Sequence, residues 1–251
     1  MTRILAVLVA ILCLGGVANA ERLRFEGHMI EGGLVLGRTE PDARVSLDGR
    51  DVRVGADGLF VIGFHREEPE PIPLTVSFAD GSVETRELTV ERRDYDIQRI
   101  DGLPEKMVTP PEAVYERIKR DAAQVRAARD RDTPEPFFVA GWIWPTEGVI
   151  SGVYGSQRIL NGTPKQPHYG IDIAAPTGTP VLAPADGIVR MAVTDHYYTG
   201  GTIILDHGFG LSSAFLHMDT VTVEVGQRLS RGEPMGTVGA GGRATGPHLD
   251  W

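Results

Sequence analysis

The chain has 251 residues, of which 41% are hydrophobic, so it is long enough for one large domain or two smaller ones with a real core. Its 31 glycines and 17 prolines indicate many turns, and therefore short strands rather than long helices. The formal net charge of −9 argues against the basic surface with which proteins bind nucleic acid or anionic membranes.

The first 20 residues have the pattern of a secretory signal peptide. Arg3 is followed by an apolar run over 4–17 and then by Ala18-Asn19-Ala20, a small-residue cleavage pattern. The apolar run is too short for a comfortable membrane span. We therefore expect cleavage after Ala20 and a periplasmic or secreted protein with no stable membrane span in its mature form.

Cys13 is the only cysteine, and cleavage would remove it. A lipoprotein anchor at Cys13 is disfavoured because Leu12, and not a small residue, precedes it. The mature chain would then contain no thiol, which avoids mispairing in an oxidising compartment. Arg3 is the only charged residue among the first 20, so 24 basic and 34 acidic residues would remain, with a formal charge of −10.

Residues 21–100 predict a small antiparallel, immunoglobulin-like β-sandwich with no chemistry of its own. Asp48-Gly49, Asp57-Gly58 and Asp80-Gly81 are hairpin-type dipeptides, and strand-like runs such as 43–47 and 59–62 lie between them. His28 and His65 fall in this region without a second ligand type at metal-binding spacing. We interpret both as ordinary surface or core residues.

Residues 101–136 predict a connecting helix and a linker. Thr109 is a suitable N-cap, with prolines in the first turn and Glu112 three residues on. An apolar stripe then predicts one packed face, formed by Val114, Ile118, Ala122 and Val125. The basic opposite face is interpreted as solvated, and Thr133-Pro134-Glu135-Pro136 ends the helix.

Residues 137–251 predict a mostly antiparallel β-fold. The composition becomes rich in Gly, Val and Ile, and strand-like runs occur at 179–183, 187–193, 202–205, 211–216 and 221–225. The chain's one plausible long helix lies before this segment. The fold class predicted for the whole chain is therefore mainly β.

Two short stretches, each holding a histidine and an aspartate, are candidates for a metal site. His248 and Asp250 lie two residues apart and would share one face of a strand, about 6.6 Å apart. His168 and Asp172 would be about 13 Å apart if extended, so they meet at one ion only if the chain bends, which Gly170 permits. Both residue types bind zinc.

Three other histidines lie in the same part of the chain. His196 is in a predicted loop and His207 at a strand end, so both are interpreted as structural or exposed. His217 ends an apolar strand and alone would be interpreted as a core histidine.

The spaced motifs of residues 148–251 resemble those of the lysostaphin-type, LytM-like zinc metallopeptidases. These motifs occur in the family order: Ser151-Gly152-Val153-Tyr154-Gly155, His168-Tyr169-Gly170-Ile171-Asp172, Asp206-His207-Gly208, Phe215-Leu216-His217 and Gly246-Pro247-His248-Leu249. The resemblance implies an antiparallel β-sheet metallopeptidase fold of the duplicated hybrid motif type. Members of the family are peptidoglycan endopeptidases.

Carried over residue by residue, the resemblance implies a role for five side chains. His168 and Asp172 would be zinc ligands, and the third ligand position holds Asp250. His217 and His248 would be the catalytic pair, which stabilises the tetrahedral intermediate and moves protons.

Asp250 departs from the family pattern, which has histidine at this position. Aspartate binds zinc at a similar distance, but the formal charge of the loaded site falls from +1 to 0. A less positive site is a weaker Lewis acid, so Asp250 predicts a slower or more alkaline enzyme and makes a vestigial site conceivable. The chain also ends at Trp251, where the family strand usually continues, so we expect a C-terminal truncation.

Other enzyme and carrier classes are less consistent with the sequence. The run Gly239-Ala240-Gly241-Gly242-Arg243-Ala244 fits a loose dinucleotide pattern, but no helix and no acid 20 residues on can follow it. A swinging-arm carrier needs a lysine on a hairpin, and the only lysines are Lys106, Lys119 and Lys165. The sequence contains neither a His-Glu-x-x-His pattern nor a Gly-x-Ser-x-Gly pattern.

The sequence therefore predicts an exported zinc-dependent endopeptidase that hydrolyses the peptide part of peptidoglycan through attack of metal-bound water. The alternative is a catalytically degenerate module of the same fold that binds cell wall or activates a separate hydrolase. The predicted partners are peptidoglycan peptides, with a cell-wall hydrolase or a divisome protein as a further candidate. Bound zinc separates the two hypotheses, and the cleaved bond is not predicted.

Overall fold

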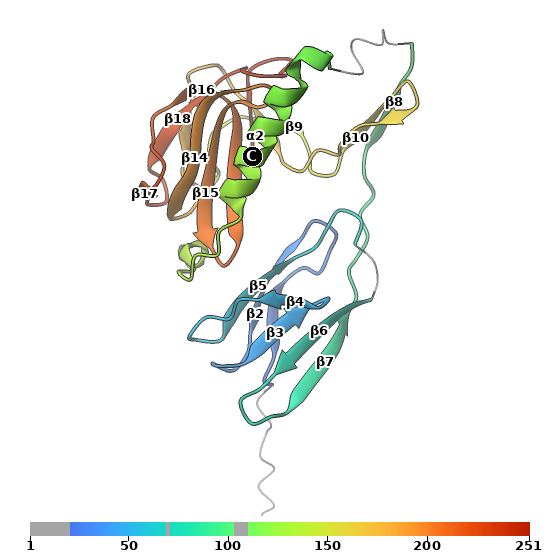
Figure 1. Cartoon of the computed structure of the whole chain (residues 1–251), viewed down its shortest axis with the longest axis vertical. Coiled ribbons are helices and arrows are strands. Elements are labelled where there is room, and N and C mark those ends of the chain that lie inside the picture. Colours follow the sequence, from blue (N-terminus) through green and yellow to red (C-terminus); the bar gives the residue numbers. More distant parts are fainter. Residues whose placement is uncertain (1–20, 69–70, 103–109) are drawn as a thin grey trace, which may run out of the picture.

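The computed structural model describes residues 21–68, 71–102 and 110–251 (Figure 1). The predicted signal peptide and the predicted cap Thr109 lie outside these ranges. Within them, no helix is both long and apolar enough to cross a membrane.

The N-terminal part forms two antiparallel sheets around one core, drawn in blue to teal in Figure 1. One sheet has the order β1 (Arg24–Gly27), β2 (Leu34–Arg38), β5 (Leu59–Gly63). The other has the order β4 (Arg50–Val52), β3 (Arg44–Leu47), β6 (Ile72–Ser77), β7 (Val83–Leu88). We call these two sheets the N-terminal sandwich.

The sandwich forms because apolar residues alternate along its strands. Val35, Phe60 and Leu74 are fully buried between the sheets. Asp48-Gly49 and Asp80-Gly81 form the predicted hairpin turns. Asp57-Gly58 also forms a turn, but it precedes β5, which pairs with β2 rather than with β4. The prediction of a hairpin at that dipeptide was therefore wrong.

A long helix, α2 (Tyr115–Arg129), follows a 3-10 turn η1 (Glu112–Val114), and another 3-10 turn, η2 (Phe137–Ala140), comes after it. Helix α2 packs on β14 and β15 of the C-terminal sheet (Figure 1). The predicted stripe was partly wrong, because Ala122 is exposed. The packed face instead includes the buried Ala128 and Asp121, whose carboxylate accepts a hydrogen bond of 2.8 Å from the Tyr197 backbone N–H.

The C-terminal part is a large antiparallel sheet, confirming the predicted fold class. Its main order is β17 (Arg228–Leu229), β14 (Gly187–His196), β15 (Gly200–Gly208), β16 (Leu211–Val221), β19 (His248–Asp250), β12 (Asp172–Ala174), β9 (Val149–Gly152). Strand β18 (Pro234–Val238) pairs with β16 and with β13 (Pro180–Leu182).

The predicted strand over 221–225 does not form. Strand β16 runs on from the predicted 211–216 to Val221, and residues 222–224 leave the sheet before the turn at Val225-Gly226. The alternation of Val221, Val223 and Val225 is therefore only partly a strand signal, because Val223 is buried in the core while Val225 is 66% exposed.

A further small sheet joins the two parts of the chain. Strand β8 (Ile97–Ile100), which follows the sandwich, pairs in parallel with β10 (Gln157–Leu160), which also pairs with β11 (Thr163–Pro164). Strands β10 and β11 of this sheet lie between β9 and the candidate ligand His168 in sequence. The two parts of the chain therefore meet in the segment that leads to the candidate metal site.

Candidate metal centre

Two adjacent strands bring the candidate ligands together. Asp172 is the first residue of β12 and Asp250 the last of β19, and the antiparallel register places them directly opposite each other. His168 lies four residues before Asp172, in the segment that leads into β12. One ligand-type atom from each of these three residues lies within 4.8 Å of the others, and all three side chains are half-buried.

The His168 imidazole points one nitrogen at both carboxylates. Its Nε2 lies 3.2 Å from Asp172 Oδ1 and 3.3 Å from Asp250 Oδ1. This Nε2 is buried and has no hydrogen-bond partner in good geometry among the described residues. The other nitrogen, Nδ1, lies 3.3 Å from the Val153 carbonyl oxygen, to which it can donate. That contact favours the tautomer in which Nε2 carries a lone pair.

The electrostatics of this cluster call for a cation. A lone pair and two carboxylates that face one point repel each other unless positive charge lies between them. Without a metal, a proton supplies it: the close carboxylates of Asp172 and Asp250 stabilise the imidazolium and raise the pKa of His168 to about 10. Burial alone would raise the pKa of Asp172, but the contact with His168, together with the nearby His248 and His217, outweighs burial and lowers it.

Two glycines make room for the carboxylates. A Cβ at Gly152 would lie 2.2 Å from Asp172 Oδ2, and a Cβ at Gly170 would lie 2.4 Å from Asp250 Oδ1. Neither glycine has a positive φ, so space rather than backbone conformation requires glycine here. The predicted bend at Gly170 therefore does not rest on a left-handed conformation.

These observations fit a divalent metal ion. The donor set is one imidazole nitrogen and two carboxylates, a combination that zinc accepts. The imidazole's second nitrogen is held by a backbone carbonyl, as is usual for metal-binding histidines. With a neutral His168, the three residues carry a charge of −2, which a divalent cation would balance.

The two candidate catalytic histidines lie beside the metal cluster. The ring centroids of His217 and His248 are 4.6 Å apart, and His248 Nε2 lies 3.7 Å from Asp172 Oδ1. His248 Nδ1 lies 2.9 Å from the Gly246 carbonyl oxygen, and His217 Nδ1 lies 2.8 Å from that of Gly241. Each Nδ1 can therefore donate to a carbonyl, which leaves each Nε2 free to accept a proton.

His217 is held in an unusual backbone conformation. Its φ of 63° is in the left-handed region, and its N–H donates to the Thr199 carbonyl at 2.7 Å. Such strained residues cluster at functional sites, where the surrounding structure holds them. Burial lowers the pKa of His217, against the opposing effect of the Gly241 carbonyl, so its imidazole is neutral at pH 7.

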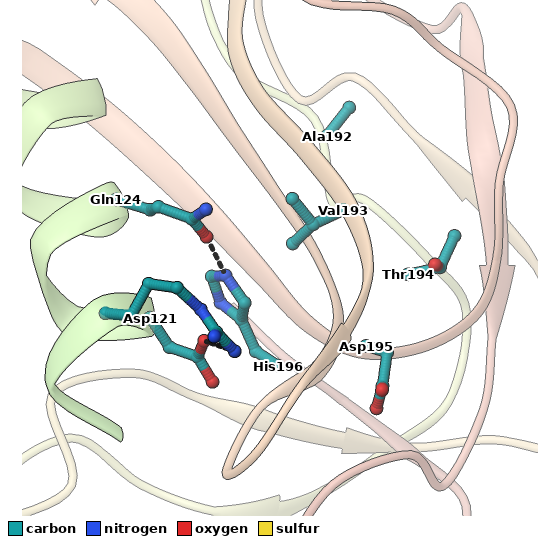
Figure 2. A pocket seen from close by; sticks show the side chains of 8 residues that line it. Asp121, Gln124, Ala192, Val193, Thr194, Asp195 and His196 are labelled. Atoms are coloured by element: carbon teal, nitrogen blue, oxygen red, sulfur yellow. Dashed lines mark hydrogen bonds and ion pairs between the residues drawn. The ribbon is translucent and has the colours of Figure 1, made fainter. Parts of the chain in front are cut away.

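The remaining described histidines lie outside the cluster. His207 is fully buried, with Nδ1 2.7 Å from the Asp186 carbonyl and Nε2 2.9 Å from Ser213 Oγ. His196 lines a groove of about 380 Å³ between α2 and β14, where its Nε2 lies 2.8 Å from Gln124 Oε1 (Figure 2). His28 and His65 are exposed on the sandwich.

Several supporting residues were not identified from sequence. The Val153 carbonyl and the glycines at 152 and 170 belong to motifs that the resemblance covers, but their roles depend on register and packing. The Gly241 carbonyl lies in the glycine-rich run 239–242, whose sequence matches only a loose dinucleotide pattern. The one sequence signal that could have indicated these supporting residues is the presence of glycines in the motifs beside Asp172 and Asp250.

Comparison with known proteins identifies the family. Residues 166–251 match the family model described as peptidase family M23. The crystal structure of a peptidase M23 protein from Pseudomonas aeruginosa aligns with 89% of this chain and 88% of its own, with a TM-score of 0.67 and 31% identity. The chain belongs to peptidase family M23. This alignment includes part of the N-terminal sandwich as well as the C-terminal part, because the C-terminal part alone is less than 89% of the chain.

Curated relatives are similar to less than half of this chain. Peptidoglycan DD-endopeptidase ShyA of Vibrio cholerae is 42% identical over 103 residues, which are 41% of this chain and 24% of ShyA. Cell division protein DipM of Caulobacter vibrioides is 36% identical over 106 residues, which are 42% of this chain and 17% of DipM. This chain thus aligns with a quarter or less of either relative's length.

Proposed function

We propose that this M23 protein is an exported zinc-dependent endopeptidase that hydrolyses the peptide part of peptidoglycan. The observation that carries the proposal is the convergence of His168, Asp172 and Asp250 beside the His217–His248 pair. The substrate class is supported by the relative named as a peptidoglycan DD-endopeptidase. Export is supported by the signal-peptide pattern of residues 1–20.

In this proposal the metal ion would be held by the His168 Nε2 and one oxygen each from Asp172 and Asp250. Zinc bound there would supply a Lewis acid for amide hydrolysis. The cross-strand register of β12 and β19 fixes the two carboxylates, and the Val153 carbonyl orients the His168 ring. The chain thus supplies three ligands, the number typical of catalytic zinc sites.

His248 and His217 would carry out the proton transfers of the reaction, on one side of the metal cluster. The free Nε2 of His248 would accept a proton from the attacking water and return it to the leaving amine. The Nε2 of His217 would donate to the oxyanion of the tetrahedral intermediate with a proton that the ring first takes up from solvent. The carbonyls of Gly246 and Gly241 fix the opposite nitrogens, so both rings need little reorganisation.

A catalytically degenerate module is the second candidate, in which the C-terminal part binds cell wall or activates a separate hydrolase. The observation that favours it is Asp250, which makes the loaded site neutral rather than positive. The relative named as a cell division protein is consistent with a hydrolase or divisome protein as a partner.

We also propose a division of the chain into domains. Residues 21–100 would form the sandwich, 101–136 the connecting helix with its linker, and 137–251 the peptidase domain.

Release of peptides from purified peptidoglycan tests the two candidates. We expect the zinc-loaded full-length protein to release new peptide termini, and His248→Ala to reduce that rate by about 10²–10⁴-fold by removing a proton-transfer group. The matched control is His65→Ala, an exposed histidine on the sandwich. An inert wild type that still binds peptidoglycan, equally well with His248→Ala, would support the degenerate module instead.

A further inference from the structure

A buried arginine of the N-terminal sandwich contacts the segment that precedes His168. Arg66 is only 5% exposed, although it carries a full charge. Its Nε donates to the Gly155 carbonyl at 2.8 Å, across 89 residues of sequence, and its guanidinium carbon lies 4.2 Å from the centroid of the Tyr95 ring. A buried charge is costly unless it is paired, and the Arg66 guanidinium is paired with the Glu67 carboxylate while its Nε bonds Gly155.

The segment that Arg66 contacts is bonded to His168 at three points. The Gly155 N–H donates to the His168 carbonyl at 2.7 Å, and the His168 N–H donates to the Ser156 carbonyl at 2.8 Å. The His168 ring contacts the carbonyl of Val153 through Nδ1. The turn over 153–156 therefore fixes both the backbone and the ring of this candidate ligand, and Arg66 reaches His168 through one intervening residue.

Aromatic packing holds the same turn against the sandwich. Tyr154 packs on Gly32 so closely that a Cβ at Gly32 would lie 2.2 Å from the Tyr154 ring. Tyr95 likewise lies where a Cβ at Gly155 would be 2.0 Å from its ring. The Tyr95 and Tyr154 rings contact each other with centroids 6.5 Å apart. The rings of Tyr95 and Tyr154 therefore hold the turn against the sandwich, in space that only glycine at 155 and 32 leaves open.

We propose that Arg66 is a positioning residue for His168. By holding the Gly155 carbonyl, it fixes the turn over 153–156 and so the direction of His168 Nε2 toward the two carboxylates. The N-terminal sandwich then forms part of the support of the metal centre. This inference rests on the proposed metal-dependent function, but its tests measure metal affinity and backbone protection rather than hydrolysis.

The first test measures zinc affinity of the full-length protein by competition with a chelating dye. We expect Arg66→Ala to weaken zinc binding about 10–100-fold, the usual cost of losing an outer support of a metal ligand. Arg66→Lys keeps a cation over Tyr95 and a donor nitrogen, so its loss should be smaller. With cobalt in place of zinc, Arg66→Ala should also change the visible absorption, which reports ligand geometry.

Arg53→Ala is the matched control. Arg53 is also on the sandwich and bonds Asp132 beyond it, with Nε 2.6 Å from Oδ1, but among the described residues no hydrogen bond or ion pair links these two side chains to His168. Its removal should leave zinc affinity and the cobalt spectrum unchanged. A general effect of loosening the sandwich would instead appear in both variants.

Hydrogen exchange gives a second readout, which does not depend on metal. Amides over 153–168 should exchange faster in Arg66→Ala than in the parent and in Arg53→Ala, while the strands of the sandwich stay protected. Unchanged zinc affinity and unchanged exchange in Arg66→Ala would overturn the inference. A parent that binds no zinc would overturn both this inference and the proposed function, whereas zinc binding without hydrolysis would overturn the proposed function alone.

Discussion

Asp172 and Asp250 face each other directly across the antiparallel pair β12–β19. Like charges at opposite positions of a sheet are destabilising, yet here both carboxylates also approach one buried imidazole nitrogen. A site that places two negative charges in register needs a cation to hold it together. The register of β12 and β19 is therefore the structural basis of the proposed metal centre.

Gly170→Ala should weaken metal binding without unfolding the protein. The new Cβ would lie 2.4 Å from Asp250 Oδ1 and close to the Trp251 backbone, so the carboxylate must move. We expect zinc affinity to fall about 10–100-fold, as for other disturbed metal supports, measured by chelator competition. Gly63→Ala, whose Cβ would make only ordinary contacts at 3.8 Å, is the control. Equal affinity in both variants would contradict the crowding argument.

Asp250→His should increase hydrolysis or shift its optimum to lower pH. The substitution replaces a carboxylate with a neutral ligand, so the loaded site gains one positive charge and becomes a stronger Lewis acid. A pH–rate profile of peptide release from peptidoglycan, for both proteins loaded with zinc, checks this. Asp250→Asn raises the charge equally but is a poorer ligand, so it should lose zinc. If wild type is inert and Asp250→His does not rescue it, the enzyme hypothesis is wrong.

The free energy of unfolding should decrease as the pH is lowered, because of His207. Burial lowers the pKa of His207, so the folded protein keeps this ring neutral while the unfolded chain protonates it near pH 6.5. The associated stability is fully present above pH 6.5 and is lost as pH falls toward the lower folded pKa. We expect the Tm to drop more between pH 7.5 and 5.5 in wild type than in His207→Gln.

The His207→Gln comparison isolates one group. Burial lowers the pKa of His217 in the same direction, but His217 is present in both proteins, so its effect cancels in the difference. Parallel Tm curves for wild type and His207→Gln would show that the buried hydrogen bonds to Asp186 and Ser213 do not exclude the proton.

The sequence predicted the elements better than their boundaries. Alternation placed β3 and β5 correctly, because a half-buried strand has a period of two. Runs rich in β-branched residues placed β14 and β15, although β15 is buried along its whole length and has no such period. It failed at Val223, which is buried in the core but not in a strand. In the helix, an apolar stripe missed Asp121, because a tertiary hydrogen bond to the Tyr197 N–H allows a carboxylate on the packed face.

Sequence motifs identified the candidate site residues, but they did not identify the residues that hold those side chains in place. Spacing and family resemblance named His168, Asp172 and Asp250, and the structure places the three within reach of one ion. No sequence pattern indicates that Asp172 opposes Asp250, or that Arg66 reaches Gly155 across 89 residues. These relationships depend on strand register and on packing between the two parts of the chain.

The zinc content of the purified full-length protein tests the metal centre most directly. After reloading and removal of free metal, elemental analysis should find about one zinc per chain in wild type and almost none in a folded Asp172→Ala variant, since catalytic zinc sites need three protein ligands. Circular dichroism would show that both proteins are folded. A folded wild type that retains no zinc, or an Asp172→Ala variant that retains as much as wild type, would contradict the proposed site.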